Sequence, residues 1–269
     1  MRARIGQHFL KDASVARRIV CALPIAEHAT VIEVGPGKGA LTAFLAERVG
    51  EVPEAELVCI ERDPALAAAL AAQSQSWRGV LPTVHTGDVR TLLREVVRSV
   101  PRTRRYAIIG NLPYYLTGHL FRILGELPRL PEAAVFMVQR EVAERLAAVP
   151  PCMNMLAASV QAWAKPSILF RVPPSAFSPK PSVESAVVSL VAVRTTPPPA
   201  EYYRAARTLF RQPRKTILNN LAAEIGRTDA VRILTEAGLN PSDRPQTLSP
   251  DKILLLSKHP PFTEAAGDV

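Results

Sequence analysis

The stretch Gly110-Asn111-Leu112-Pro113-Tyr114-Tyr115 contains residue types that a simple chain reversal does not need. It directly follows residues 106–109, an apolar run typical of a buried strand. A structural turn is commonly built from glycine, aspartate or serine. Here the side-chain carbonyl of Asn111 can accept a hydrogen bond, and the ring of Tyr114 offers a flat surface on which a base can stack.

These groups match the needs of methyl transfer to the exocyclic amine of adenine. The lone pair of that nitrogen is delocalised into the ring, so acceptors must draw its hydrogens out of the ring plane. Asn111 and the carbonyl of Leu112 or Pro113, held by the fixed φ of proline, would supply those acceptors. Because the proton can leave after methylation, no strong base is required. We therefore predict catalytic roles for Asn111, Pro113 and Tyr114, with a strand-ending turn under an aromatic lid as the structural alternative.

A second group of residues could hold a nucleoside cofactor. Residues 31–40 read as a strand, a glycine turn and a helix start, and Gly35 and Gly37 have the spacing GxGxxA that lets the backbone approach a ligand. Glu61 ends the next apolar run, where a carboxylate can accept both ribose hydroxyls of NAD or of S-adenosylmethionine. Asp88 follows a third run and either accepts from an adenine amine or caps the next helix. The glycine pattern alone leaves the choice of cofactor open.

Apolar runs recur along the chain at the spacing of an alternating strand and helix fold. They lie at residues 31–34, 57–60, 84–86, 106–109 and 134–138, and helix-like segments such as 40–48 and 64–73 separate them. This order is typical of a doubly wound parallel sheet.

The end of this region is expected to add an antiparallel pair of strands. Residues 168–172 and 186–193 are separated by a proline-rich loop that is too short for a crossover helix. A parallel sheet with such an edge is typical of class I methyltransferases and unusual in simple dehydrogenases. We predict an α/β, Rossmann-like class I S-adenosylmethionine-dependent methyltransferase fold with a seven-stranded, mostly parallel sheet.

A proline-rich segment at residues 195–199 reads as a semi-rigid linker. Helices are predicted beyond it, at 201–211, 214–224, 228–238 and 250–257. We therefore predict two domains. Residues 1–196 would form the methyltransferase domain with an N-terminal arm, and residues 197–269 a small helical domain.

The charge of the chain indicates a polyanionic partner. Lys and Arg number 33 against 24 Asp and Glu, a net charge of +9 over 269 residues, which favours nucleic acid over an anionic membrane surface. Basic residues concentrate at 1–20, 90–105 and 201–220. In the last cluster, Arg204, Arg207, Arg211 and Arg214 follow at steps of three, four and three, which predicts one face of a helix. A solvated face is the alternative for each cluster.

Several classes of protein are excluded. No apolar run approaches the eighteen or so residues of a membrane span, and the N-terminus lacks the apolar core of a signal peptide. Cys21, Cys59 and Cys152 lie far apart and lack the spacing of metal ligands. We expect a soluble, cytoplasmic monomer without a metal and without membrane contact.

Motifs along nearly the whole chain resemble those of the small-subunit rRNA adenine N6,N6-dimethyltransferases (the RsmA/KsgA family). NLPYY at 111–115 and the FxPxPxVxS pattern within 173–190 are the most specific. The others are GQHFL at 6–10, VIEVGPGKGALT at 31–42, IERD at 60–63, GD at 87–88, VQREVAERL at 138–146 and RKT at 214–216.

The resemblance implies a reaction and a set of site residues. Members of that family use S-adenosylmethionine to dimethylate two adjacent adenosines in a hairpin loop near the 3′ end of small-subunit rRNA during ribosome maturation. Tyr114 and Phe177 would sandwich the target adenine. The cofactor would be contacted by His8, Leu10, Gly35, Glu61, Asp88 and Asn111. The basic residues of the helical domain, with Arg207, Arg211 and Arg214 as candidates, would bind RNA phosphates.

Two departures from the family pattern and three alternatives accompany this prediction. His8 stands where the family usually has asparagine, and Met153-Asn154-Met155 replaces a tyrosine-glycine-arginine, which removes a basic residue. The alternatives are an Erm-type large-subunit rRNA methyltransferase, a non-catalytic RNA-binding assembly factor on the same fold, and an NAD-dependent dehydrogenase. The dehydrogenase alternative is weakened because the chain has no obvious histidine or tyrosine-lysine pair for hydride transfer.

Overall fold

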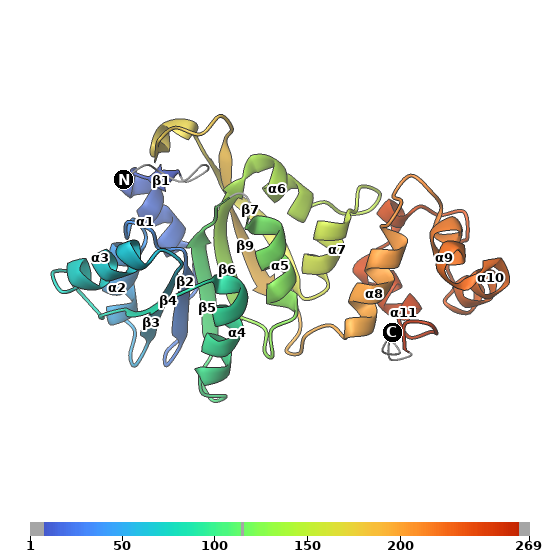
Figure 1. Cartoon of the computed structure of the whole chain (residues 1–269), viewed down its shortest axis with the longest axis horizontal. Coiled ribbons are helices and arrows are strands. Elements are labelled where there is room, and N and C mark those ends of the chain that lie inside the picture. The colour runs from blue at the N-terminus through green and yellow to red at the C-terminus, as the bar shows by residue number, and fades with distance from the viewer. Residues whose placement is uncertain (1–7, 114–115, 264–269) are drawn as a thin grey trace.

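The structure is a computed structural model that describes residues 8–113 and 116–263. Its centre is a seven-stranded sheet in the order β4-β3-β2-β5-β6-β9-β7 (Figure 1). The first five strands of that order are parallel, and β9 runs antiparallel to both β6 and β7. The predicted sheet and its antiparallel edge are confirmed. The strands are β2 (Thr30–Val34), β3 (Glu56–Glu61), β4 (Thr83–Thr86), β5 (Tyr106–Asn111), β6 (Ala133–Gln139), β7 (Ala164–Val172) and β9 (Ser185–Ala192).

Helices cover both faces of the sheet, because successive residues of its central strands point to opposite sides. Ile32 of β2 packs in one buried cluster together with residues of α4 and α5. Its neighbour Val31 packs in a second cluster with residues of α1 and α2. These central strands are therefore apolar on both faces, as parallel strands usually are. The helices are α1 (Ala13–Cys21), α2 (Thr42–Gly50), α3 (Pro64–Ser74), α4 (Val89–Ser99), α5 (Thr117–Gly125), α6 (Arg140–Leu146) and α7 (Met155–Gln161).

The N-terminal arm pairs with the proline-rich loop that precedes β9. Strand β1 (Phe9–Leu10) runs antiparallel to β8 (Phe177–Ser178), which follows the short 3-10 helix η1 (Pro174–Ala176). The Lys11 amide donates to the Ala176 carbonyl at 2.9 Å and extends the pairing. Two segments that are distant in the sequence are thus joined beside the sheet.

The C-terminal helices share a hydrophobic cluster with α7. Leu209, Ile217 and Leu234 are buried in it beside Ala157 and Ala158 of α7. The helical part therefore packs directly on the last helix before the antiparallel edge (Figure 1). Its elements are α8 (Ala200–Leu209), α9 (Ile217–Ile225), α10 (Arg227–Glu236), the 3-10 helix η2 (Pro245–Thr247) and α11 (Pro250–Leu256).

Asn154, one of the departures from the family pattern, caps α7. Its side-chain oxygen accepts from the Leu156 and Ala157 amides at 3.0 and 3.1 Å, and its side-chain nitrogen donates to the Arg145 carbonyl at 2.8 Å. The residue thus satisfies amides at the helix start that would otherwise lack partners.

The prediction that four arginines share one helix face was wrong. Helix α8 ends at Leu209 and α9 begins only at Ile217, so Arg211 and Arg214 lie in the turn between them. Asn220 stabilises this turn, because its side chain accepts from the Gln212 amide and donates to the Gln212 carbonyl, both at 3.0 Å.

Arg204 also differs from the prediction. It is half-buried, forms an ion pair with Glu201 at 3.0 Å, and donates to the Phe262 carbonyl. Its guanidinium is therefore occupied within the helical part. Arg207, Arg211 and Arg214 are exposed.

Among the described residues, no helix combines the length and apolarity needed to cross a membrane. The same residues contain no group of three or more histidine, cysteine, aspartate or glutamate side chains placed to hold a metal ion.

Candidate active site

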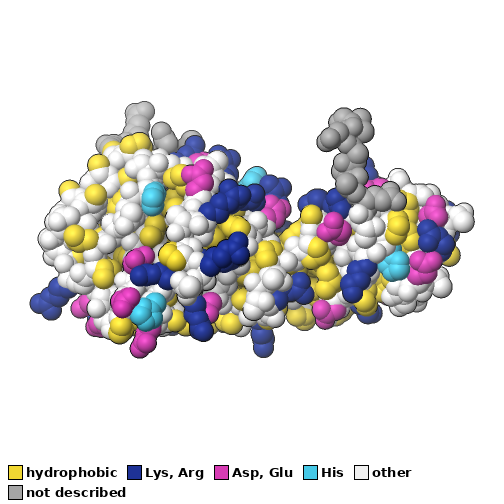
Figure 2. Space-filling view, turned by 90° about the horizontal axis from the view of Figure 1, so that it is seen from below, with side chains coloured by type: hydrophobic (Ala, Val, Ile, Leu, Met, Phe, Trp, Pro, Cys, Tyr) yellow, Lys and Arg dark blue, Asp and Glu magenta, His cyan; other side chains and the backbone are white. Residues whose placement is uncertain are grey.

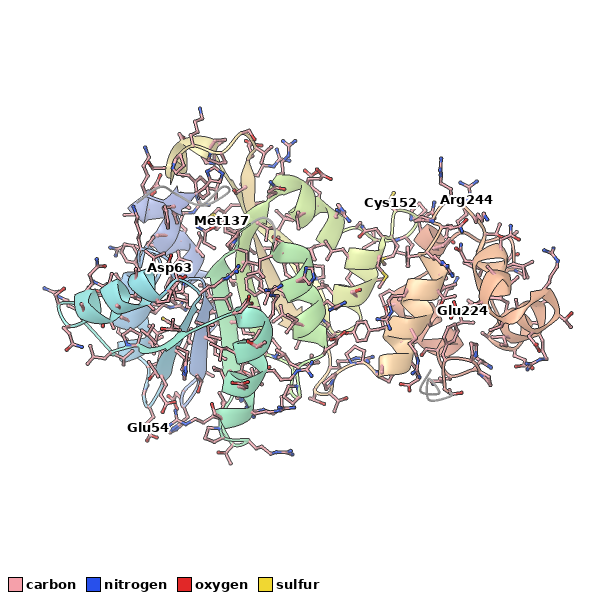
Figure 3. The ribbon with its side chains drawn as sticks, viewed as in Figure 1. Glu54, Asp63, Met137, Cys152, Glu224 and Arg244 are labelled. Carbon is pink, nitrogen blue, oxygen red and sulfur yellow. The ribbon has the colours of Figure 1, made fainter. Side chains whose placement is uncertain are left out.

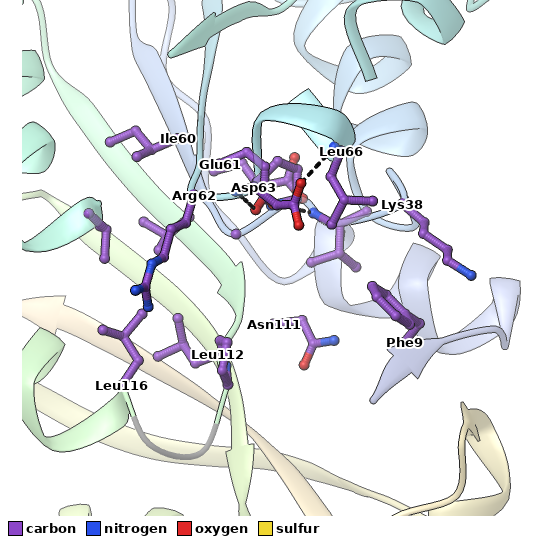
Figure 4. A pocket seen from close by; sticks show the side chains of 18 of the residues that line it. Phe9, Lys38, Ile60, Glu61, Arg62, Asp63, Leu66, Asn111, Leu112 and Leu116 are labelled. Atoms are coloured by element: carbon purple, nitrogen blue, oxygen red, sulfur yellow. Dashed lines mark hydrogen bonds between the residues drawn. The ribbon is translucent and has the colours of Figure 1, made fainter. Parts of the chain in front are cut away.

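A cavity of about 550 Å³ opens at the carboxyl edge of the sheet (Figure 4). Parallel strands end at one edge, so residues that follow different strands meet there. Tyr114, which was predicted to stack on the base, lies outside the described residues. The other predicted catalytic and cofactor-binding residues all line the cavity, and so does Phe177, the second residue predicted to stack on the base. Together these residues are His8, Leu10, Gly35, Gly37, Glu61, Asp88, Asn111, Pro113 and Phe177.

The glycine loop follows β2 with its backbone in a left-handed conformation. Gly35 and Gly37 have φ values of +67° and +58°, which residues with a Cβ rarely adopt. A Cβ on Gly35 would meet nothing within 4 Å, so the space beside this residue is open. The loop therefore presents bare backbone to the cavity.

Glu61, at the end of β3, is held by two backbone amides. One carboxylate oxygen accepts from the Gly37 amide and the other from the Asp63 amide, both at 2.9 Å. The side chain is only 6% exposed. Each oxygen keeps a second lone pair for a ligand hydroxyl. The sequence predicted a ligand-binding role for this carboxylate but not its role in holding the glycine loop.

Asp88 caps α4, so the helix-capping alternative is present in the structure. Its Oδ1 accepts from the Arg90 amide at 2.9 Å, and its Oδ2 lies 2.7 Å from the Arg90 guanidinium. The hydrogen bond from the Arg90 side chain lowers the pKa of Asp88, although some burial acts against it. Asp88 still lines the cavity as a carboxylate, and its contact with adenine stays a prediction.

Asn111 ends β5 and directs its side chain toward the cavity (Figure 4). The residue before it is Gly110, where a Cβ would lie 2.6 Å from the Val34 carbonyl, so only glycine lets β5 lie this close to β2. The Pro113 carbonyl accepts from the Leu116 amide at 2.9 Å and from the Thr117 hydroxyl at 3.4 Å. Those bonds favour the Leu112 carbonyl as the backbone acceptor for a substrate.

Sequence reasoning missed Glu33, a buried carboxylate that also lines the cavity. It is 1% exposed, and the Cys59 thiol donates to its Oε2 at 3.7 Å. Burial raises the pKa of Glu33 to about 7, and the charge of Glu61 acts in the same direction. The sequence feature that could have indicated this residue is a single acidic side chain within the apolar run at residues 31–34.

Replacing Glu33 by glutamine should change how stability depends on pH. Between pH 4.5, the ordinary pKa, and about 7, the native state keeps a proton that the unfolded state has released. The free energy of unfolding of the parent should therefore fall over this range as pH rises. As the pH rises over this range, the free energy of unfolding of Glu33→Gln should increase relative to that of the parent by up to about 3 kcal/mol. Urea unfolding of the ligand-free chain measures this difference. Glu56→Gln, an exposed control, should not gain, and a pH-independent difference for Glu33→Gln would contradict this account.

The arm residues and Phe177 close one side of the cavity. His8 Nδ1 lies 2.8 Å from the Pro179 carbonyl, which ties the arm to the proline-rich loop. Leu10 is paired with Phe177, and their exposed fractions are only 6% and 3%. A base at this site would therefore meet only the part of the Phe177 ring that borders the cavity.

The predicted RNA-binding arginines lie apart from the cavity. Arg207, Arg211 and Arg214 belong to the end of α8 and the turn after it, in the helical part. Figure 2 shows basic side chains on both the larger and the smaller part of the molecule, interspersed with acidic ones.

The basic cluster at residues 90–105 is divided by the structure. Arg90 lines the cavity, whereas Arg104 donates to the Glu54 carbonyl at 3.0 Å. Figure 3 shows Glu54 and Met137 at opposite ends of the strands, with Met137 near the end at which the cavity opens. Arg104 and Arg105 are also ion-paired, with Glu56 at 3.0 Å and with Glu132 at 3.2 Å. This cluster is therefore not one continuous surface.

Comparisons with solved structures agree with the fold. A dimethyladenosine transferase from Plasmodium falciparum superposes with a TM-score of 0.71 and 21% identity, covering 93% of this chain and 96% of that one. The 23S rRNA methyltransferase ErmE superposes with a TM-score of 0.67 and 24% identity, covering 93% and 98%. At these identities the similarity shows the class I methyltransferase fold.

The sequence comparisons are more specific. The ribosomal RNA small subunit methyltransferase A of Dehalococcoides mccartyi (strain CBDB1) is 36% identical over 255 residues, which is 92% of this chain and 84% of that protein. The model of the family described as ribosomal RNA adenine dimethylase matches residues 1–259. Because the match spans both the sheet with its cavity and the C-terminal helices, this chain belongs to the ribosomal RNA adenine dimethylase family.

Proposed function

We propose that this protein dimethylates N6 of two adjacent adenosines in the 3′-terminal hairpin loop of small-subunit rRNA during ribosome biogenesis. The observation that carries the proposal is that Asn111 lines the same cavity as Glu61 and the glycine loop. A hydrogen-bond acceptor for an amine and the residues suited to a nucleoside cofactor thus face one space. The name of the D. mccartyi relative supports the small subunit as the substrate.

The residues of the cavity fit S-adenosylmethionine. Its volume of about 550 Å³ is in the range of ligand sites, and Gly35 and Gly37 leave room for close approach of a ligand. Glu61 would accept the ribose hydroxyls and Asp88 the adenine amine, while His8, Leu10 and Gly35 would contribute further contacts. When bound, this cofactor supplies an electrophilic methyl group.

The residues around Asn111 would prepare the target amine. The Asn111 side-chain oxygen and the Leu112 carbonyl would accept the two amine hydrogens and so direct the nitrogen lone pair out of the ring plane. Pro113 would hold this backbone by its fixed φ. Tyr114 and Phe177 would stack on the two faces of the extruded base. The proton would leave to water after transfer, when the nitrogen is cationic.

We propose that residues 1–196 act as the catalytic domain and residues 197–269 as an rRNA-binding domain in a cytoplasmic protein. Arg207, Arg211 and Arg214 are exposed at the end of α8 and in the turn after it. An exposed basic turn can contact phosphates without reading bases.

The triple variant Arg207→Gln, Arg211→Gln, Arg214→Gln should bind small-subunit rRNA about tenfold more weakly at physiological salt. Each phosphate contact releases condensed counterions, so the slope of log affinity against log salt should also fall by about two to three. Filter binding over a salt series measures both, and S-adenosylmethionine affinity should not change.

A matched control removes the same charge elsewhere. The triple variant Arg98→Gln, Arg102→Gln, Arg105→Gln alters the helix α4 and the segment after it, and should leave the salt slope close to that of the parent. Equal losses in both triple variants would mean that net charge, and not the turn after α8, determines RNA binding.

The proposed substrate is tested by offering labelled S-adenosylmethionine together with small and large ribosomal subunits that lack the modification. Label should enter small-subunit rRNA and be recovered as N6,N6-dimethyladenosine. Label in the large subunit would support an Erm-type enzyme, whose fold this chain shares. Binding to small subunits without any label transfer would support a non-catalytic assembly factor.

A further inference from the structure

Phe9 has no role in the core and no assigned role in the site. In a strand, neighbouring side chains point to opposite sides, and β1 follows this rule. Leu10 is buried with the cluster around α1 and α2. Phe9 is half-buried, belongs to none of the hydrophobic clusters, and lines the cavity. The pairing of β1 with β8 thus presents an aromatic ring to the cavity.

Two neighbours hold this ring in place. A Cβ on Gly37 would lie 3.3 Å from the Phe9 ring, so the ring rests against the glycine loop. The Lys38 Nζ lies 4.7 Å from the ring centroid, which is within the range of a cation–π contact. In the view of Figure 4, the ring separates the Lys38 side chain from Asn111.

The position of Gly37 indicates which part of a ligand the ring would meet. The Gly37 amide donates to the Glu61 carboxylate at 2.9 Å, and Glu61 is the residue assigned to the ribose hydroxyls. A ring that rests against Gly37 therefore stands beside the ribose and the sulfur bonded to it.

We propose that Phe9 is a further cofactor-binding residue that covers the ribose and sulfur of S-adenosylmethionine, and that Lys38 is a positioning residue that holds the ring. This inference rests on the proposed function, because it takes the cavity to be the cofactor site. The ring removes one face of the ligand from water. The arm is anchored by Leu10 and by its pairing with β8, so the ring is in place before the ligand arrives.

Calorimetry on the full chain tests this with two probes, S-adenosylhomocysteine and 5′-methylthioadenosine. Both contain the ribose and the sulfur, but only the first carries the amino-acid end. Phe9→Ala should raise the dissociation constant of both probes about tenfold, and Phe9→Leu, which keeps an apolar side chain, should raise it less. Lys38→Met should raise both about threefold, and Lys38→Arg should restore the parent value.

A second cation–π pair in the chain provides the control. Arg18 lies over the Phe170 ring at 3.8 Å, and neither residue lines the cavity. Arg18→Met should therefore leave both dissociation constants unchanged. If Phe9→Ala and Phe9→Leu bind both probes as the parent does, the proposal is wrong.

Two further outcomes would also overturn it. A loss confined to S-adenosylhomocysteine would place Phe9 at the amino-acid end and contradict the assignment to ribose and sulfur. A parent chain that binds neither probe would overturn the proposed function, and this inference with it. By contrast, a parent that binds both probes, together with Phe9 variants that bind them equally well, would overturn this inference and leave the proposed function standing.

Discussion

Asn111→Ala should lower the rate of methyl transfer a hundredfold or more while the chain stays folded. The side-chain oxygen is expected to accept from the target amine as its geometry changes toward the transition state. Removing one preorganised polar group of this kind costs about 3 kcal/mol. The side chain lines the cavity and is not part of a hydrophobic cluster, so little packing is lost. Single-turnover transfer from labelled S-adenosylmethionine to small subunits measures the effect.

A surface asparagine gives the matched control for this variant. Asn219→Ala, on the exposed side of α9, should transfer methyl groups at the parent rate. Thermal unfolding should show that Asn111→Ala is folded. Near-parental turnover by Asn111→Ala would contradict the proposed role of this residue.

Glu61→Ala should raise the dissociation constant of S-adenosylmethionine a hundredfold or more. Two charge-assisted hydrogen bonds to ribose are expected to be lost, each contributing about 1.5 to 3 kcal/mol. The structure adds a second cause, because the Gly37 and Asp63 amides also lose their acceptor. The glycine loop would then no longer be held against the end of β3. Calorimetry measures the affinity.

Two other substitutions separate the effect of charge from that of position. Glu61→Gln keeps one side-chain oxygen and should bind with an affinity between those of the parent and the alanine variant. Glu56→Ala, at the exposed start of the same strand, should bind like the parent. An unchanged affinity in Glu61→Ala would remove this carboxylate from the site, and tight NAD binding by the parent would revive the dehydrogenase alternative.

The strands of the sheet could be predicted because their signal is local. Apolar runs such as those ending at Val34 and Ile109 have few alternatives to burial, and the polar residues after them must emerge at one edge of a parallel sheet. The predicted antiparallel edge followed from a loop that is too short for a crossover. For the same reason, Glu61, Asp88 and Asn111 could be expected at one edge before their positions were known.

Other features depend on contacts that no local pattern contains. Spacing alone predicted a continuous helix through Arg204, Arg207 and Arg211. The chain instead leaves the helix after Leu209, and the side chain of Asn220 satisfies the backbone of the following turn. A periodic pattern of charges cannot indicate whether the backbone between them finds hydrogen-bond partners outside a helix.

The class of fold, the family and the side of the sheet at which polar residues gather could all be predicted from the sequence, because these features depend on the order of apolar runs and on motifs of neighbouring residues. Two other features become visible only in the folded chain: Phe9 pairs with Ser178 and lines the cavity, and the pKa of Glu33 is raised. The first depends on pairing between distant segments. The second depends on the loss of water around a carboxylate, and both arise only when the whole chain is packed.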